Sequence, residues 1–237
     1  MDTVTGVIIP SAGRGSRMRS GQPKQLLRIG SMTVLGHTIS RILRVQGVRQ
    51  LVIPAADDLA GQTADIATAC IEASGRKAEV ELTMVPGGAE RMHSVGNGLD
   101  ALAGTDIRLV MVHDAVRPCF PLDAVGRALH TADQYGAAIL GVPARDTVKL
   151  VDEDRRITAT PDRSRVWLAQ TPQVFRLEVL AEAYARTGEE GLVATDDASL
   201  VEAAGFEVRV LEGSHDNIKI TYAPDLVFAE HWLKHNP

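Results

Sequence analysis

The feature that most constrains the fold is a regular alternation of short apolar runs with amphipathic segments of helical length. The apolar runs predict strands at residues 4–10, 50–54, 80–85, 108–113 and 137–142. The segments between them predict helices at 34–45, 57–74, 94–102 and 122–135, with Asp57 or Asp58 capping the second. Near-continuous apolar strands separated by helices indicate an α/β fold whose parallel sheet is covered on both faces.

The stretch 145–165 departs from this alternation. Two β-prone pieces, 147–151 and 156–160, flank an acidic turn and predict a hairpin that projects from the domain. Such a hairpin is too short to bury a core of its own, so we expect a second copy of the chain to cover it in a homodimer. Beyond it, strands are predicted at 166–169, 207–211 and 218–221, and helices at 177–186, 196–204 and after Pro224.

Charge and composition exclude several classes of partner. The net charge is −5 and the chain has no long basic run, so we expect no nucleic-acid partner. The N-terminal segment does not resemble a signal peptide, and no apolar run approaches the ~20 residues that span a bilayer. The cysteines, Cys70 and Cys119, form no disulfide or zinc pattern. We therefore expect a cytoplasmic protein without a membrane partner.

The loop at 11–18 carries the strongest local signal. It lies at the carboxyl edge of the predicted sheet, as do the loops at 86–91 and 114–118, and ligands bind at that edge. Gly13 and Gly15 allow a close backbone approach to phosphate, and Arg14, Arg17 and Lys24 crowd the loop and its exit. The loop matches neither the P-loop nor the dinucleotide pattern. A triphosphate is the favoured ligand, and a plain strand-to-helix turn with solvated basic residues is the alternative.

The segment after the strand at 108–113 supplies a carboxylate at the same edge. Asp114 can hold Mg²⁺ against phosphates, and Arg117 can bind a second anion. His113 could suggest zinc, but no further His or Cys stands at ligand spacing, so a hydrogen-bonded structural role is favoured.

Other basic, hydroxyl and glycine residues could join this site. Five are scattered along the second half of the chain: Thr147, Lys149, Arg163, Thr171 and Lys219. Thr195 and Asp196 first suggest a helix cap. The backbone of Gly87 and Gly88 could read a base, and Ser94 could either cap its helix or touch a nucleotide.

The chemistry that suits this set is attack on phosphorus. No Ser-His-Asp or Cys-His arrangement and no acid pair is evident. A phosphate monoester has its second pKa near 6 and is therefore already a nucleophile at pH 7. Its attack on an α-phosphate needs alignment and charge neutralisation, which Arg, Lys and Mg²⁺ supply.

These motifs, taken in order, resemble the 2-C-methyl-D-erythritol 4-phosphate cytidylyltransferase family of the non-mevalonate isoprenoid pathway. The matching pieces cover nearly the whole chain: PSAGRGSRM–PKQ, GGAER–SV, VHDAVRP, RDTVK, DR–WLAQTPQVF, TDDAS and DNIKIT. The resemblance implies one Rossmann-like, mostly parallel nucleotidyltransferase domain over 1–237, of the nucleotide-diphospho-sugar transferase type, with a dimerising β-arm at 145–165. It also implies an Mg²⁺-dependent enzyme that converts CTP and the alcohol phosphate to a CDP-alcohol and pyrophosphate.

The resemblance implies roles by position. Arg17 and Lys24 would stabilise the transition state, Lys219 would hold the α-phosphate and Asp114 would bind the metal. Arg163 and Thr147 of the neighbouring subunit's arm would hold the substrate phosphate. Arg117, Thr171 and Thr195 would line the substrate site. The nucleotide would be bound by Ala12, Gly13, Arg14, Gly15, Gly88, Ser94 and Ala115.

Departures and rivals leave specificity open at this point. Ala89 stands where the family often has Asp, Ser11 where Ala is usual, and Pro161 where Val is commoner. The nearest rival is a ribitol-5-phosphate cytidylyltransferase, which shares several motifs, and a broader one is a sugar-1-phosphate uridylyltransferase. A catalytically silent nucleotide-binding protein is the alternative from another class.

Overall fold

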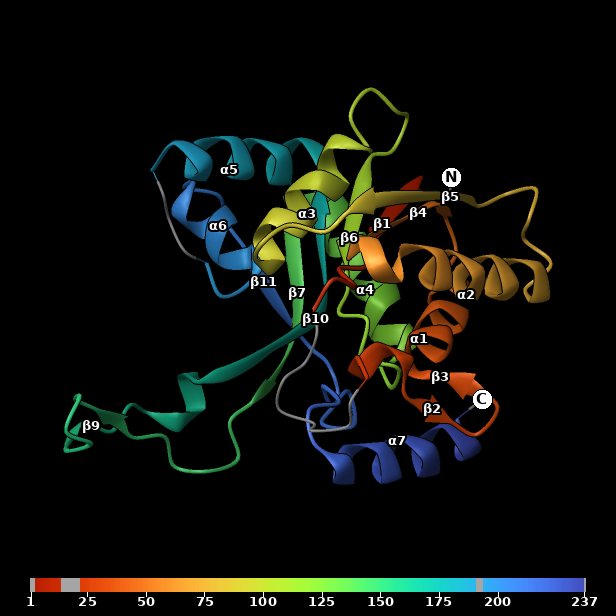
Figure 1. Ribbon diagram of the computed structural model, residues 1–237. Helices are drawn as coiled ribbons and strands as arrows, with labels where there is room; N and C mark the ends of the chain where they lie inside the picture. The colour runs from red at the N-terminus through yellow and green to blue at the C-terminus, as the bar shows by residue number, and fades with distance from the viewer. Residues whose placement is uncertain (1–2, 14–21, 191–193, 237) are drawn as a thin grey trace.

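The computed structural model describes residues 3–13, 22–190 and 194–236, and its centre is a twisted sheet (Figure 1). Within these residues, seven strands form the sheet in the order β11-β7-β10-β6-β1-β4-β5. Their bounds are β1 (Thr5–Ile8), β4 (Val48–Ala55), β5 (Glu81–Pro86), β6 (Leu109–Val112), β7 (Ala137–Pro143), β10 (Trp167–Arg176) and β11 (Arg209–Glu212). Apart from β10, neighbouring strands run parallel, which confirms the predicted α/β class.

Alternating side chains along the central strands build two separate cores. In β6, Leu109 and Met111 face one core while Val110 and Val112 face the other. This is the period-two pattern of a strand that is buried on both sides. The continuous apolar runs in the sequence follow directly from that double burial.

Helices cover both faces of the sheet, as Figure 1 shows. One core packs against α1 (Val34–Ile42), α2 (Ala60–Ala73) and α4 (Leu122–Tyr135). The other packs against α3 (Arg91–Asp100), α5 (Leu177–Glu190) and α6 (Asp197–Ala203). The molecule therefore has three layers, and the loops at the carboxyl ends of the strands form one exposed edge.

The strand β10 differs from the prediction in length and direction. We predicted a strand at 166–169, but β10 continues to Arg176 and pairs antiparallel with both β6 and β7. Pro172 lies inside it, at an irregularity between Gln170 and Gln173. A proline cannot donate a hydrogen bond to the strand ladder, so in a sequence it indicates the end of a strand. Here the irregularity in the pairing lets the strand continue past Pro172.

Residues 147–160 extend away from the body of the molecule (Figure 1). The short strands β8 (Leu150–Val151) and β9 (Ile157–Ala159) pair antiparallel in a two-stranded sheet of their own. The apolar side chains of Leu150, Val151 and Ile157 are all more than half exposed. We call residues 145–165 the arm.

Three smaller predictions were wrong. The residue that precedes α2 at the cap position is Leu59, not Asp57 or Asp58, which lie in a short 3-10 turn, Asp57–Leu59, ahead of that helix. The helix predicted from Ser94 begins three residues earlier, which places Ser94 inside α3. Residues 218–221 form no strand; the Ile220 N–H donates to the Val116 carbonyl without a continuing ladder.

A third apolar cluster fixes the C-terminal helix beside the site edge. The helix α7 (Ala223–His235) contributes Ala229, which packs with Val34, Val116 and Ile220. Nearby lie a short turn, Lys24–Leu26, and the small hairpin of β2 (Arg28–Ile29) and β3 (Met32–Thr33). Among the described residues, no helix is long and apolar enough to cross a membrane.

Candidate active site

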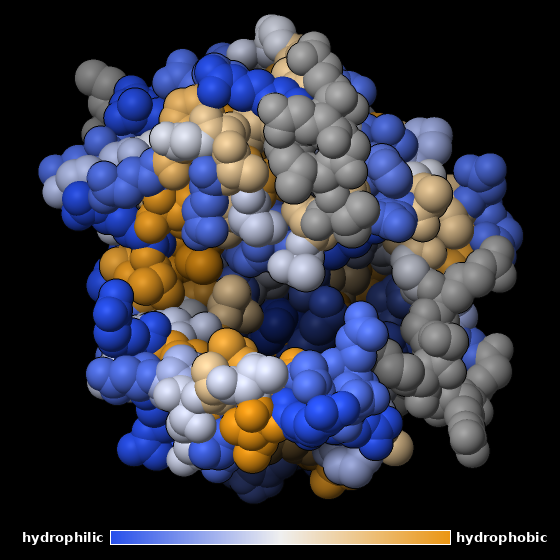
Figure 2. Space-filling model, turned by 90° about the vertical axis from the view of Figure 1, so that its left-hand side faces the viewer, coloured by the Kyte–Doolittle hydropathy of each residue, from blue (hydrophilic) through white to orange (hydrophobic). Residues whose placement is uncertain are grey.

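A cavity of about 310 Å³ opens at the carboxyl edge of β1 and β6. The face that carries the arm is hollowed at its centre, and hydrophilic residues line the depression (Figure 2). The loops after β1, β5 and β6 and the segment before α7 build the walls. The lining residues include Ala12, Gly13, Lys24, Gly88, Glu90, Arg91, Ser94, Asp114, Ala115 and Lys219.

A second cavity of about 240 Å³ adjoins the first. The two share Arg91, Asp114 and Lys219, which therefore stand at their junction. Its other walls come from the loop after β6, the middle of β10 and the segment before α6. They include Arg117, Gln170, Thr171, Gln173, Thr195 and Asp196.

Asp114 lies at this junction among three cations, a set we call the Asp114 cluster. Its Oδ1 is 3.2 Å from Arg91 Nε, and its Oδ2 is 2.9 Å from Lys219 Nζ and 3.3 Å from Arg117 Nε. Burial alone raises the pKa of Asp114, but the charges of Lys219, Arg91 and Arg117 outweigh burial and hold that pKa well below its usual range. The carboxylate is therefore ionised at any physiological pH.

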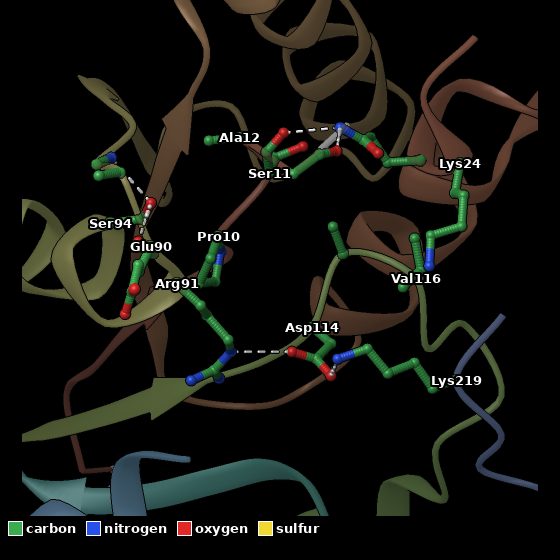
Figure 3. Close-up of a pocket in the computed structure, with 15 residues that line it drawn as sticks. Pro10, Ser11, Ala12, Lys24, Glu90, Arg91, Ser94, Asp114, Val116 and Lys219 are labelled. Carbon is green, nitrogen blue, oxygen red and sulfur yellow. Dashed lines mark hydrogen bonds and ion pairs between the residues drawn. The ribbon is translucent and has the colours of Figure 1, made fainter. Parts of the chain in front are cut away.

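Second partners fix the two arginines of this cluster. Arg91 Nη1 is 2.8 Å from Asp197 Oδ2, and Arg117 Nη1 donates to the Asn217 carbonyl at 2.7 Å. Burial disfavours the charge on Arg91, but Asp197 and Asp114 together raise its pKa above the usual range. Lys219 has a more exposed side chain than either arginine and reaches toward Asp114 alone in Figure 3.

Hydrogen bonds of Thr171 and Asn217 connect the segments that form the walls of the two cavities. The Asp114 N–H donates to Thr171 Oγ1 at 3.1 Å, and Asn217 Nδ2 donates to the Thr171 carbonyl at 2.8 Å. Asn217 is fully buried, so these bonds form where water does not compete. The strand β10 and the loops that carry Arg117 and Lys219 are thus tied into one unit.

The first loop is anchored by a glutamine. Gln25 Nε2 donates to the Ser11 and Gly13 carbonyls at 2.8 and 3.1 Å. Its neighbour Lys24 is buried and extends into the first cavity near Val116 (Figure 3). The structure thus brings Lys24 and Lys219 to one cavity, while Arg14, Gly15 and Arg17 lie outside the described residues.

The loop after β5 holds its shape through close backbone packing. The Gly88 N–H donates to Ser94 Oγ at 3.0 Å, so Ser94 closes this loop and does not cap α3. A Cβ on Gly88 would lie 2.2 Å from His93 Cβ, a distance that real side chains do not tolerate. Glycine at this position lets the loop turn tightly against the start of α3.

The start of α6 supplies one predicted cap. Asp196 Oδ1 accepts from the Ser199 N–H at 3.0 Å, which confirms Asp196 as the cap residue. Its other oxygen accepts from Gln173 Nε2 at 2.7 Å. Thr195 lies beside this cap in the wall of the second cavity and is not the cap itself.

The predicted arm residues lie elsewhere in their own chain. Neither Thr147 nor Arg163 lines either cavity. Arg163 Nη1 donates to the Arg145 carbonyl at 2.8 Å, and Lys149 Nζ donates to Thr160 Oγ1 at 2.9 Å. Within one chain the structure therefore separates these residues from the Asp114 cluster.

His113 is a structural histidine. It is fully buried, and its Nε2 lies 2.9 Å from the Arg117 carbonyl. Burial lowers the pKa of His113 to about 4, so the ring is neutral at pH 7. No group of three His, Cys, Asp or Glu side chains in the described part of the chain is arranged to hold a metal.

Sequence reasoning did not single out four side chains that organise this site: Gln25, Arg91, Asp197 and Asn217. Each stands inside a motif that drew attention for a neighbouring residue. Their partners lie far away along the chain, so no local pattern marks them. A carboxylate such as Asp197 directly after a capping residue is the one feature that could have raised suspicion.

Comparison with known proteins gives consistent matches. The family model IspD, described as 2-C-methyl-D-erythritol 4-phosphate cytidylyltransferase, matches residues 5–235. Proteins of that name from Desulforamulus reducens and Geobacter metallireducens are 39% and 43% identical to this chain. The first match covers 96% of this chain and 94% of the relative, and the second covers 96% of each. The crystal structure of 4-diphosphocytidyl-2C-methyl-D-erythritol synthase from Anaerococcus prevotii superimposes with a TM-score of 0.82 at 28% identity, covering 98% of this chain and 97% of that one.

Proposed function

The chain belongs to the 2-C-methyl-D-erythritol 4-phosphate cytidylyltransferase family, and from this premise we propose how its two cavities perform that reaction. The enzyme transfers the cytidylyl group of CTP to 2-C-methyl-D-erythritol 4-phosphate. The products are 4-diphosphocytidyl-2-C-methyl-D-erythritol and pyrophosphate. The names of the relatives favour this substrate over ribitol 5-phosphate.

The Asp114 cluster at the junction of the cavities is the observation that carries the mechanism. A bond forms between an oxygen of the alcohol phosphate and the α-phosphorus of CTP. The bond from that phosphorus to the oxygen bridging to the β-phosphate breaks, and its electron pair leaves with pyrophosphate. Because the monoester is largely deprotonated at pH 7, the step needs alignment and positive charge and no general base.

The first cavity suits CTP. Ala12, Gly13, Gly88, Ser94 and Ala115 line it, and these small residues leave room for a base and a ribose. Lys24 and Lys219 meet the triphosphate from two sides and offset the charge that grows on the leaving group. We assign Arg14, Gly15 and Arg17 to the same phosphates on the resemblance alone.

The second cavity suits the alcohol phosphate. Arg117 brings positive charge, and Thr171 and Thr195 bring hydroxyl groups to its wall. The cavity meets the first at Asp114, so a phosphate bound here approaches an α-phosphate bound there. Such proximity is worth several orders of magnitude in rate.

We propose Mg²⁺ as the divalent cation of the reaction, held by Asp114. The residues fit this ion, since Mg²⁺ in nucleotide sites takes one or two carboxylates and completes its shell with phosphate oxygens and water. Asp114 is ionised and stands where the triphosphate would lie. When bound, the ion neutralises charge on the phosphates.

We propose that the arm completes the site of a second subunit in a homodimer. Arg163 and Thr147 do not reach the cavities of their own chain, and the arm exposes Leu150, Val151 and Ile157. An exposed apolar hairpin this small needs a covering surface. In this proposal the single domain 1–237 uses the arm 145–165 to deliver both residues to its partner.

We propose that the enzyme works in the cytoplasm. Both cysteines, Cys70 and Cys119, are buried and unpaired, which suits a reducing compartment.

Pyrophosphate release tests the proposed function. Purified protein is incubated with Mg²⁺, each of the four NTPs, and either methylerythritol phosphate or ribitol 5-phosphate. We expect release with CTP and methylerythritol phosphate, at a rate well above every other pair. Faster release with ribitol 5-phosphate or with UTP would replace this function by one of the rivals, and CTP binding without release would indicate a silent protein.

A further inference from the structure

Arg91 is held from both sides at the junction of the two cavities. It is the first residue of α3, and its Nε faces Asp114 while its Nη1 faces Asp197. The remaining nitrogen, Nη2, is buried and has no hydrogen-bond partner in the described part of the chain. The two carboxylates therefore set the orientation of the guanidinium plane.

Asp197 has a second partner that lies outside both cavities. Tyr184, on α5, donates its hydroxyl to Asp197 Oδ1 at 2.7 Å. Asp197 is 1% exposed, so this carboxylate is dry and must be satisfied by protein groups. The Tyr184 ring also packs near Gly96 of α3, which brings the hydroxyl close to the start of that helix.

The pairing divides the cations of the Asp114 cluster into two kinds. Arg91 and Arg117 each have a second anchor, in Asp197 and in the Asn217 carbonyl. The Lys219 side chain is 42% exposed and pairs with Asp114. An arginine between two carboxylates has less reason to turn toward a triphosphate than one that faces a single carboxylate, because turning leaves a buried charge unpaired.

We propose that Tyr184 and Asp197 form a positioning pair that locks Arg91 onto Asp114, so that Lys219 is the cation of the cluster that moves to the phosphates. The inference rests on the proposed function for the identity of those phosphates. Tyr184 touches no substrate and acts through Asp197 and Arg91. Removing its hydroxyl loosens Arg91, and Asp114 with it, at the point where both substrates meet.

Kinetics of Tyr184→Phe test the pair. A lost hydrogen bond to a buried carboxylate predicts that kcat falls about tenfold, with a smaller change in the KM for CTP. The same loss lowers the midpoint of thermal unfolding by about 3–10 °C, so the assay is run well below the midpoint of the variant. The matched control is Tyr135→Phe, since Tyr135 lies outside both cavities with its ring against Arg209. A Tyr184→Phe enzyme with a kcat within twofold of wild type would overturn the proposal.

A double-mutant cycle sharpens the test. Asp197→Asn removes the charge that holds Arg91, so we expect a larger loss of kcat than with Tyr184→Phe. In the double variant we expect Tyr184→Phe to cause no further loss of kcat, because Asp197 no longer connects Tyr184 to Arg91. Additive losses would show that Tyr184 acts by another route and would overturn the pair.

A spectroscopic measurement separates this inference from the proposed function. We expect the arginine side-chain NMR spectrum to show a distinct Arg91 Nε–H signal in wild type and in Tyr135→Phe, and a shifted or broadened one in Tyr184→Phe. An unchanged signal in Tyr184→Phe overturns the positioning pair. An absence of pyrophosphate release by wild type instead overturns the proposed function.

Discussion

Predicted site residues lie in two contrasting regions, the buried and ion-paired Asp114 cluster and the exposed arm. Asp114 and Arg117 are largely buried, and ion pairs within the same chain set their positions. On the arm, Ile157 is 63% exposed, and the Arg163 side chain donates to the nearby Arg145 carbonyl. One region is organised before any ligand arrives, whereas the predicted site residues of the other line neither of the two cavities in their own chain.

This difference follows from what surrounds each region. The cluster stands at the end of a sheet that is covered on both faces, where a low dielectric strengthens each ion pair. The arm is a two-stranded hairpin in water, where pairs such as Arg156 with Asp154 add little stability. Buried ion pairs therefore fix the cluster within one chain, as stabilisation of transition-state charge requires. In our proposal the arm residues reach a site only when two subunits associate.

The largest expected effect tests the preorganised region. Lys24→Ala lowers kcat by about 10²- to 10³-fold, because the lysine neutralises charge that grows in the transition state. The dissociation constant for CTP, measured by calorimetry, changes far less. The control is Lys77→Ala, because Lys77 is exposed, pairs with Glu72 of α2 and lines neither cavity. Equal losses in CTP binding and in turnover would assign Lys24 to ground-state binding.

The fold was predictable from sequence where burial dictates the residues. Continuous apolar strands and amphipathic helices predicted the mostly parallel sheet, and Leu122–Tyr135 was predicted to the residue. The exceptions were positions where a local rule was overridden. Pro172 led to the prediction of a strand that ends too early, although β10 continues past it. The apolar residues around Lys219 predicted a strand, although the Ile220 N–H donates to the Val116 carbonyl without a continuing ladder.

The lining of the first cavity was predictable where the residue type and its place in the sequence pattern together indicate a chemical role. A carboxylate after a buried strand marked Asp114, and basic residues near glycines marked Lys24. Arg91 escaped notice because an arginine at the start of a helix normally faces water, and only the distant Asp114 and Asp197 draw its side chain inward. Such pairs depend on the tertiary fold, so one sequence alone does not reveal them.

The second effect tests delivery by the arm. Arg163→Ala raises the KM for the alcohol phosphate about 30-fold and leaves CTP affinity unchanged, because one charge-assisted hydrogen bond to the phosphate is lost. Steady-state kinetics with each substrate varied in turn measure both values. An increase in the KM for CTP of the same size would place Arg163 at the nucleotide.

Mixing variants then shows whether the site is shared. In a heterodimer of Lys24→Ala and Arg163→Ala chains, one site carries both changes and the other carries neither. Random mixing makes half of the dimers heterodimers, so about a quarter of wild-type activity returns. If no activity returns after the subunits are shown to exchange, Arg163 acts within its own chain.

A third and smaller effect concerns the apolar face of the arm. Ile157→Asp places a charge where we expect a covered contact, so the dimer weakens and activity per chain falls about tenfold at low protein concentration. Sedimentation measured alongside activity follows both quantities, and Glu153→Gln, an exposed change in the acidic turn, is the control. A variant that remains dimeric and fully active would remove the arm from the interface.

The smallest expected effect concerns the wall of the first cavity. It tests whether the backbone at Gly88, without a side chain at position 89, is sufficient for the preference for CTP. Ala89 is exposed, while the neighbouring Gly88 is held by Ser94 Oγ and leaves no room for a side chain. Because backbone packing sets the loop, we expect Ala89→Asp to change the KM for CTP by less than about threefold, the size of an exposed charge effect. The preference for CTP over UTP stays the same, whereas Gly88→Ala, which forces a clash with His93, impairs both nucleotides. A tenfold gain in CTP preference from Ala89→Asp would instead assign base reading to this side chain, and the first cavity would no longer be complete through its backbone.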